Sequence, residues 1–311
     1  MLLTQVFDTM QRSSAISFPM FGEGSINPPP YFTVFGFDVY FYGAFIALGF
    51  LLAIGYCSRN SKRFGIKSDD IYDVVLWLIP FSLLGARLYY VAFKLDYYLL
   101  HPGEILAFRD GGLAIYGGVI AGIITIYFVC RRKKVPLGAM LDIVVFGLLL
   151  GQICGRMGNF MNREAFGAPT EIFCRMGLTN PAGETIYVHP TFLYEMLWNL
   201  GCFIFLSVMT AKGKRRYDGQ FVFIYFLWYG IGRAWIEGLR TDSLYIGSTS
   251  IRVSQALSIA LALISLIVLI YKGRQPQSPE RLYVYSQTKK NAEAQAPAGE
   301  EINKTEEIQN G

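Results

Sequence analysis

The stretch Leu137-Gly-Ala-Met-Leu-Asp-Ile-Val-Val-Phe-Gly-Leu-Leu-Leu-Gly-Gln-Ile-Cys154 contains a single charged residue, Asp142. A helix of this length covers about 27 Å, close to the roughly 30 Å of hydrocarbon in a bilayer. The stretch therefore predicts a membrane-spanning helix, and the rest of the chain repeats its pattern.

Comparable apolar runs extend on both sides of this one. They cover residues 39–57, 71–93, 113–130, 191–210, 220–239 and 253–271. The hydrophobic share of 53% and the aromatic share of 15% are above those usual for soluble proteins. We therefore predict an all-α, polytopic integral membrane protein with about seven transmembrane helices.

Lysine and arginine are unevenly distributed over the connections between these runs. Segments 58–70, 131–136 and 211–218 carry four each, whereas 94–112, 158–190 and 240–252 carry two each. Cytoplasmic loops are the richer in these residues. The distribution predicts an N-terminus outside and a cytoplasmic C-terminus, and the net charge of +5 reflects topology more than a partner.

Three regions follow from this topology. Residues 1–38 form an extracytoplasmic or interfacial segment, without the basic region and apolar core of a cleaved signal, so we expect the first helix to direct insertion. Residues 39–272 form the membrane domain, with an outer loop at 158–190. Residues 273–311 are rich in Glu, Gln, Lys and Ala and are expected to be disordered.

Several classes of function are not indicated by the sequence. The two histidines, His101 and His189, are far apart, and the five cysteines show no C-x-x-C spacing, so we predict no metal site. No basic cluster is interleaved with aromatic residues, which argues against a nucleic-acid partner. Nothing indicates a nucleotide site, and we expect no cofactor.

Charged residues inside the runs are the candidates for function, because each costs at least about 2.5 kcal/mol near the centre of a bilayer. Asp73 and Asp142 are interpreted as N-terminal acids of their own helices. Arg87, Arg156, Arg233 and Glu237 fall toward the predicted outer face, and they could converge there.

Arg233 and Glu237 are four residues apart and share a helix face. One interpretation is a simple intrahelical ion pair, which hides charge without forming a site. Tyr229 lies on the same face and Arg240 follows. A face of tyrosine, arginine and glutamate also suits an anionic lipid head group, so both interpretations remain open.

The most informative stretch follows the run quoted first: Gly155-Arg-Met-Gly-Asn-Phe-Met-Asn-Arg-Glu-Ala-Phe-Gly167. Two glycines flank Arg156 at the membrane edge, and Asn159, Asn162 and Glu164 follow with hydrogen-bonding groups. A glycine-rich turn beside an arginine can hold phosphate. The alternative is an ordinary polar loop with an arginine that extends to the interface.

This stretch closely resembles the signature of the prolipoprotein diacylglyceryl transferase family, Gly-Arg-x-Gly-Asn-Phe-x-Asn-x-Glu-x-x-Gly, with every specified position filled. The resemblance extends to Tyr42-Gly43, Asp110-Gly111-Gly112, Gly117-Gly118, His189-Pro190 with Tyr194-Glu195, and the face from Arg233 to Glu237. It covers residues 39–271. The chain departs from the family at Tyr116, where well-known members carry a histidine with an assigned catalytic role.

The resemblance implies transfer of a diacylglyceryl group from phosphatidylglycerol to the lipobox cysteine thiol of a prolipoprotein, in the bacterial cytoplasmic membrane. The products are a thioether and glycerol phosphate, and no cofactor takes part. The positively charged groups would favour the thiolate and stabilise the leaving phosphate.

The same resemblance implies roles for individual residues. Arg156 and Asn159 are expected on the phosphatidylglycerol head group, Arg233 on the departing phosphate, and Glu237 beside Arg233 to orient it. Further lipid-binding residues are expected at Tyr42, Tyr229, Glu164 and Gly167. The general base is left open between Tyr116, a poor base because its reference pKa is near 10, and His189.

A transporter or channel for a small anionic solute is the main alternative from another class. It would place charges at several depths along a path, whereas this chain concentrates them toward the predicted outer face. An intramembrane serine protease would need a Gly-x-Ser-Gly motif in one span and a histidine on another, and we find neither.

Overall fold

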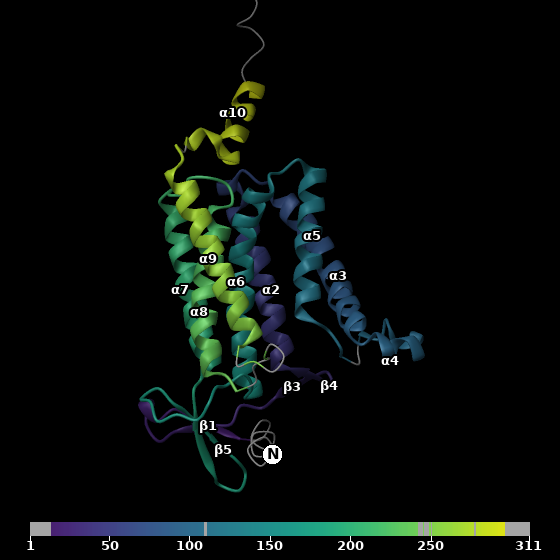
Figure 1. Ribbon diagram of the computed structural model, residues 1–311, viewed down its shortest axis with the longest axis vertical. Coiled ribbons are helices and arrows are strands. Elements are labelled where there is room, and N and C mark those ends of the chain that lie inside the picture. The colour runs from purple at the N-terminus through teal and green to yellow at the C-terminus, as the bar shows by residue number, and fades with distance from the viewer. Residues whose placement is uncertain are drawn as a thin grey trace, which may run out of the picture.

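The body of the protein is a bundle of long helices (Figure 1). The computed structural model describes residues 14–108, 111–241, 245, 249, 251–276 and 278–295. The long helices are α2 (Phe41–Asn60), α3 (Ser68–Phe93), α5 (Ile115–Lys133), α6 (Leu137–Asn162), α7 (Thr191–Ala211), α8 (Gln220–Leu239) and α9 (Val253–Arg274). They correspond to the seven predicted runs.

Six of these helices, all except α8, are long and apolar enough to cross a membrane. The chain is therefore a polytopic membrane protein, as predicted. Helix α8 has a comparable length of 20 residues and packs on α7 and α9. It contains two charged residues, Arg233 and Glu237. The count of seven spans thus stays a prediction.

Helices α3 and α5 form a close pair, which Figure 1 shows beside the rest of the bundle. Small residues make the approach possible. A Cβ added to Gly117 would lie 2.3 Å from the Gly85 carbonyl oxygen, and one added to Gly85 would lie 2.3 Å from the Ala121 Cβ. Only glycine allows two backbones to come this close.

Helix α6 is tied to the start of α8 by the Asp142 carboxylate, which is fully buried. Its oxygens accept backbone N–H bonds from Gly219, Phe221 and Val222 at 2.9, 2.8 and 3.2 Å. These are donors that a helix start leaves without intrahelical partners. Asp142 therefore caps α8, and its interpretation as an N-terminal acid of its own helix was wrong.

Short strands at one end of the bundle add β-structure that an all-α prediction omitted. Strands β1 (Ala15–Ser17), β2 (Ser25–Ile26), β5 (Met176–Thr179) and β6 (Thr185–Val188) form an antiparallel sheet in the order β2-β1-β5-β6. A hairpin, β3 (Tyr31–Val34) and β4 (Phe37–Tyr40), leads directly into α2. The N-terminal segment thus has ordered structure next to the first helix.

Arg163 fastens this segment to the end of α6. Its guanidinium donates to the Ser14 carbonyl at 2.8 Å, the Asn27 Oδ1 at 2.5 Å and the Pro28 carbonyl at 2.6 Å. The side chain is only 2% exposed. Its role is to join two parts of the chain that are far apart in sequence.

The opposite end of the bundle carries the basic connections and helix α10 (Tyr283–Gln295). We predicted disorder from residue 273, yet the structure describes a helix in this segment. The Tyr283 N–H donates to Asp218 Oδ2 at 3.0 Å, and a Cβ on Gly65 would lie 2.7 Å from the Val284 Cα. The prediction is wrong for this part because specific contacts hold the helix start against the bundle.

Candidate active site

The Glu195 carboxylate, near the start of α7, is the centre of a charged cluster at the sheet end of the bundle. Glu195 is 5% exposed. Its Oε2 forms an ion pair with Arg156 of α6, and its Oε1 lies 2.5 Å from Arg233 Nη1 of α8. Two predicted site arginines from different helices therefore meet at one buried carboxylate.

The end of α8 contributes a second carboxylate and a third arginine. Arg233 Nη2 lies 2.6 Å from Glu237 Oε2, so the predicted pair is present. Arg240 Nη1 lies 3.7 Å from Glu195 Oε1. The pairing of Arg233 therefore extends beyond its own helix, and the interpretation as an isolated intrahelical pair does not fit.

The signature residues after Arg156 form a chain of polar contacts. Arg156 Nη1 donates to Asn159 Oδ1 at 3.0 Å, and Asn159 Nδ2 donates to Glu164 Oε1 at 2.9 Å. Asn162 Nδ2 donates to the same Glu164 oxygen at 3.2 Å. Glu164 thus fixes the Asn159 amide, which in turn orients the Arg156 guanidinium.

Gly167 is the point where the loop of residues 163–190 passes between the start of α7 and the end of α8. Its N–H donates to the His189 carbonyl at 2.8 Å, and it forms a bridge with Arg240. A Cβ here would lie 2.6 Å from the Leu239 carbonyl oxygen. Close packing therefore explains why residue 167 is a glycine. We had predicted it as a lipid-binding residue.

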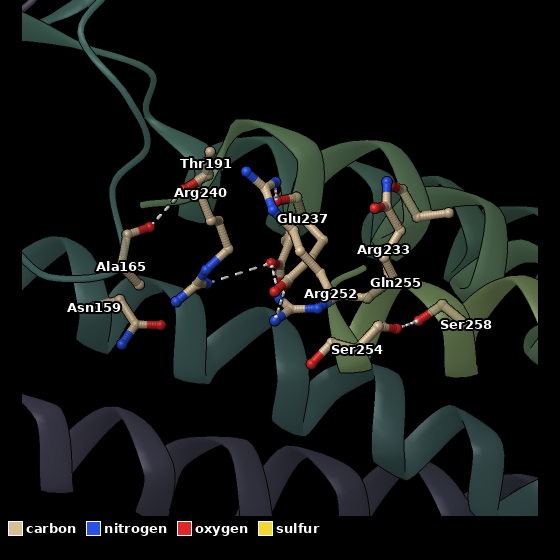
Figure 2. Close-up of polar contacts among 12 residues, drawn as sticks. Asn159, Ala165, Thr191, Arg233, Glu237, Arg240, Arg252, Ser254, Gln255 and Ser258 are labelled. Atoms are coloured by element: carbon tan, nitrogen blue, oxygen red, sulfur yellow. Dashed lines mark hydrogen bonds and ion pairs between the residues drawn. The ribbon is translucent and has the colours of Figure 1, made fainter. Parts of the chain in front are cut away.

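Nearby loop contacts hold the start of α7 in place. Thr191 Oγ1 donates to the Ala165 carbonyl at 2.6 Å (Figure 2). In the same view the Arg240 side chain extends toward Asn159. The loop and the three helices thus bring the signature and the charges of α8 to one place.

Three tyrosines differ in their relation to the cluster. Tyr229 lies within electrostatic range of Arg156, Glu195, Arg233 and Tyr116, and it lines a small cavity together with Arg233 and Trp198. Tyr116 is 41% exposed. The Tyr42 ring packs on Gly158, where a Cβ would lie 2.7 Å from Tyr42 Cδ2.

Arg87 does not join the cluster, contrary to the possibility raised by the sequence. It is 2% exposed. Its guanidinium donates to four loop carbonyls, those of Glu104 and Gly111 at 2.6 Å each, Ile105 at 2.8 Å and Gly112 at 3.1 Å. It therefore organises the connection between α3 and α5. Asp110 of the resemblance lies outside the described residues.

His189 lies beside the cluster with its ring directed to other partners. Its Nδ1 is 3.4 Å from the Tyr194 hydroxyl, which is 3.5 Å from Cys174 Sγ. Burial lowers the pKa of His189 below its ordinary value of 6.5, because burial disfavours the charged ring. The ring is therefore neutral at neutral pH.

This lowered pKa predicts a pH-dependent stability. The unfolded chain takes up a proton on His189 near pH 6.5, whereas the folded protein resists it, so stability should fall as the pH drops through 6.5. His189→Gln should reduce the difference between the thermal unfolding midpoints at pH 7.5 and pH 5.5. The same change at the exposed His101 is the control, and an equal effect there would contradict the assignment.

Sequence reasoning missed the central position of Glu195. It was quoted as part of the resemblance, and it was not assigned to the site. A signal was present, because an acid one turn into an apolar helix requires a partner. Of the three arginines around it, Arg156 belongs to α6, Arg233 to α8, and Arg240 follows the end of α8. No sequence spacing relates them to Glu195.

The arrangement can bind an anionic group. Arg156, Arg233 and Arg240 point at one carboxylate, and arginine forks fit phosphate as well as they fit carboxylate. A phosphate that entered beside Glu195 would find these donors already in place. Glu195 and Glu237 are 5% and 1% exposed, and such burial strengthens each electrostatic contact.

Comparisons with known proteins agree with this chemistry. The family model described as prolipoprotein diacylglyceryl transferase matches residues 29–271. Proteins named phosphatidylglycerol–prolipoprotein diacylglyceryl transferase are similar over most of their length. The one from Finegoldia magna is 43% identical over 251 residues, 80% of this chain and 98% of the relative.

Two further relatives carry the same name. The protein from Bacillus cereus is 41% identical over 252 residues, covering 79% of this chain and 92% of its own length. The protein from Enterococcus faecalis is 41% identical over 257 residues, covering 79% of this chain and 90% of its own length. The family match, residues 29–271, includes α2 to α8 and all but the last residues of α9.

Proposed function

Because this chain belongs to the prolipoprotein diacylglyceryl transferase family, we propose that the cluster around Glu195 binds the phosphate of phosphatidylglycerol during transfer. The protein is a transferase that moves a diacylglyceryl group from phosphatidylglycerol to a prolipoprotein. The main support for this site is that Arg156 and Arg233 share one buried carboxylate, that of Glu195.

The acceptor is the thiol of the lipobox cysteine. Its thiolate attacks the glycerol carbon that bears the phosphodiester, a C–S bond forms, and the C–O bond to phosphate breaks. The phosphate leaves with the electron pair as glycerol phosphate. Arginines that face its oxygens stabilise the transition state more than the ground state, because negative charge grows there as the bond breaks.

Arg233 takes the departing phosphate, and Arg156 with Asn159 takes the rest of the head group. Glu195 and Glu237 hold the arginines in their orientation before the lipid arrives. Glu164 supports this arrangement through Asn159. Tyr229 is the tyrosine best placed to add a hydroxyl donor, because it interacts with both arginines.

The proton of the thiol needs an acceptor within reach of the attacking sulfur. Tyr116 lies within electrostatic range of Tyr229 and thus borders the cluster. His189 is neutral at neutral pH and can accept a proton, but its Nδ1 faces Tyr194. Tyr116 is the better placed of the two, and His189 is the better base. Substitution of each residue in turn, with the rate of transfer as the measurement, decides which of them accepts the proton.

The bundle crosses the membrane seven times, with α8 as the seventh span. Support comes from its length and from its packing between α7 and α9. The basic connections lie at one end and the charged cluster at the other, which favours a cytoplasmic C-terminus and an outward-facing site. The protein belongs in the bacterial cytoplasmic membrane.

A direct assay tests the reaction. Purified protein is incubated with phosphatidylglycerol and a lipobox peptide that has one cysteine, and the peptide mass is measured. We expect a gain equal to one diacylglyceryl group and an equal molar release of glycerol phosphate. The matched peptide with serine, and phosphatidylcholine as the lipid, should give no product. No mass gain from folded protein would refute the assignment.

A further inference from the structure

We infer that the groove between α3 and α5, at the end of the bundle opposite the charged cluster, binds an anionic phospholipid of the cytoplasmic leaflet. The groove has a volume of about 680 Å³, within the roughly 300–1,000 Å³ usual for ligand pockets. The inference relies on the proposed orientation only in naming the leaflet.

The shape of the groove follows from the way the two helices pack. Gly85 and Gly117 bring the backbones together toward the sheet end, where even a Cβ would clash. Toward the basic end the facing residues are large, among them Trp77 and Phe128. The helices therefore leave a recess between them on this half of the pair.

One face of each helix lines the recess. Asp73, Trp77 and Phe81 are spaced by four residues on α3, and Ile124, Phe128 and Arg132 repeat this spacing on α5. Eight residues of helix cover about 12 Å, close to half of the roughly 30 Å hydrocarbon layer. The recess thus matches one acyl chain in one leaflet.

The apolar wall is exposed and aromatic. Trp77 and Phe81 stack with ring centroids 5.9 Å apart, and they are 50% and 46% exposed. Phe128 on the facing helix is 65% exposed. Such a surface is stable in hydrocarbon, and an acyl chain is the occupant that a membrane supplies to it.

The charges at the mouth of the groove decide which lipid is preferred. Lys133 pairs with Asp73, and it lies 3.7 Å from Asp70, so two carboxylates fully compensate its charge. Arg132 lines the groove, is exposed, and forms no ion pair with any residue that the structure describes. A phosphate at the head of the acyl chain would supply the missing anion.

Trp77 allows the proposal to be tested at the groove itself. Its fluorescence is obtained as the difference between the unmodified protein and Trp77→Phe, in nanodiscs of phosphatidylcholine with a rising fraction of lipid brominated on its chains. Brominated phosphatidylglycerol should quench Trp77 at about a fivefold lower mole fraction than brominated phosphatidylcholine. Equal quenching would mean ordinary boundary lipid and would overturn the proposal.

Two matched pairs of variants locate the contact. Arg132→Gln should weaken the phosphatidylglycerol effect about fivefold, which corresponds to about 1 kcal/mol for one cation near the membrane surface. Arg131→Gln removes the same charge from a residue that lies over the Tyr127 ring outside the groove, and it should change quenching less than twofold. An equal loss of the phosphatidylglycerol preference in both variants would mean that the lipid responds to the general positive charge of this end and has no site in the groove.

The second pair tests the acyl chain. Ile124 lines the groove and Ile123 does not, yet both are 49% exposed on the same helix. Ile124→Phe should fill the recess and reduce quenching, whereas Ile123→Phe should not. An equal reduction of quenching in both variants would place the acyl chain outside the groove. Lipid binding here is measured without any peptide, so it does not depend on the transfer reaction.

Discussion

Replacing Arg233 with glutamine is expected to lower kcat/KM for diacylglyceryl transfer by about 10²- to 10³-fold, the usual effect of removing one donor from a developing oxyanion. Arg233 faces both Glu195 and Glu237 and is assigned to the leaving phosphate. Most of the loss should appear in kcat, because the contact strengthens as the C–O bond breaks. Product mass against time, at several lipid concentrations, gives both constants.

Two further variants sharpen this test. Arg233→Lys keeps the charge but not the two-pronged geometry, so it should recover only part of the activity. Arg216→Gln removes an exposed arginine just before α8, at the other end of the bundle, and should leave kcat/KM unchanged. An Arg233→Gln protein that folds and turns over normally would show that the phosphate binds elsewhere.

Glu195→Gln is expected to damage both stability and activity. Without its charge, Arg156, Arg233 and Arg240 would face a neutral amide at a buried position. Removing one partner of a buried ion pair costs about 3–5 kcal/mol, so the thermal unfolding midpoint should fall clearly. Activity should fall as well, because the arginines would no longer be held at the spacing that the phosphate requires.

A double substitution separates this explanation from a simple packing defect. If Glu195 mainly neutralises the arginines, then Arg240→Gln should be less destabilising, or even stabilising, in the Glu195→Gln background. Additive losses would contradict that role. Glu171→Gln at an exposed position of the outer loop is the control and should leave the midpoint unchanged.

The helices could be predicted because their signal lies within each segment. An apolar run of about twenty residues needs no knowledge of the rest of the chain, so all seven runs correspond to helices. The capping of α8 by Asp142 could not be predicted, because the carboxylate and the start of α8 are about 77 residues apart in sequence. The pairing of β1 with β5 was missed for the same reason, whereas β3–β4 and β5–β6 are local hairpins that a search for apolar helices did not consider.

In the candidate site, too, features that lie within one short segment could be predicted, whereas contacts between distant segments could not. Arg156, Asn159 and Glu164 lie within nine residues, and the pattern that groups them predicted one site, whereas their mutual hydrogen bonds are seen only in the structure. Arg233 and Glu237 follow from helical spacing. Glu195 became central only when α7 was placed between α6 and α8. Arg87 was misjudged because its partners are backbone carbonyls of a loop, which side-chain identities do not reveal.

The sheet at the end of the bundle sets an order for the assembly of the chain. Strand β1 pairs with β5 through Ala15 and Thr179, and the four long helices α2, α3, α5 and α6 lie between them in sequence. During synthesis the first strand is made early but must wait until all four helices have been produced. Arg163 closes the same long loop. The N-terminal segment therefore reaches its final place only after α2, α3, α5 and α6 have been made, whereas α7, α8 and α9 follow β5 in the sequence.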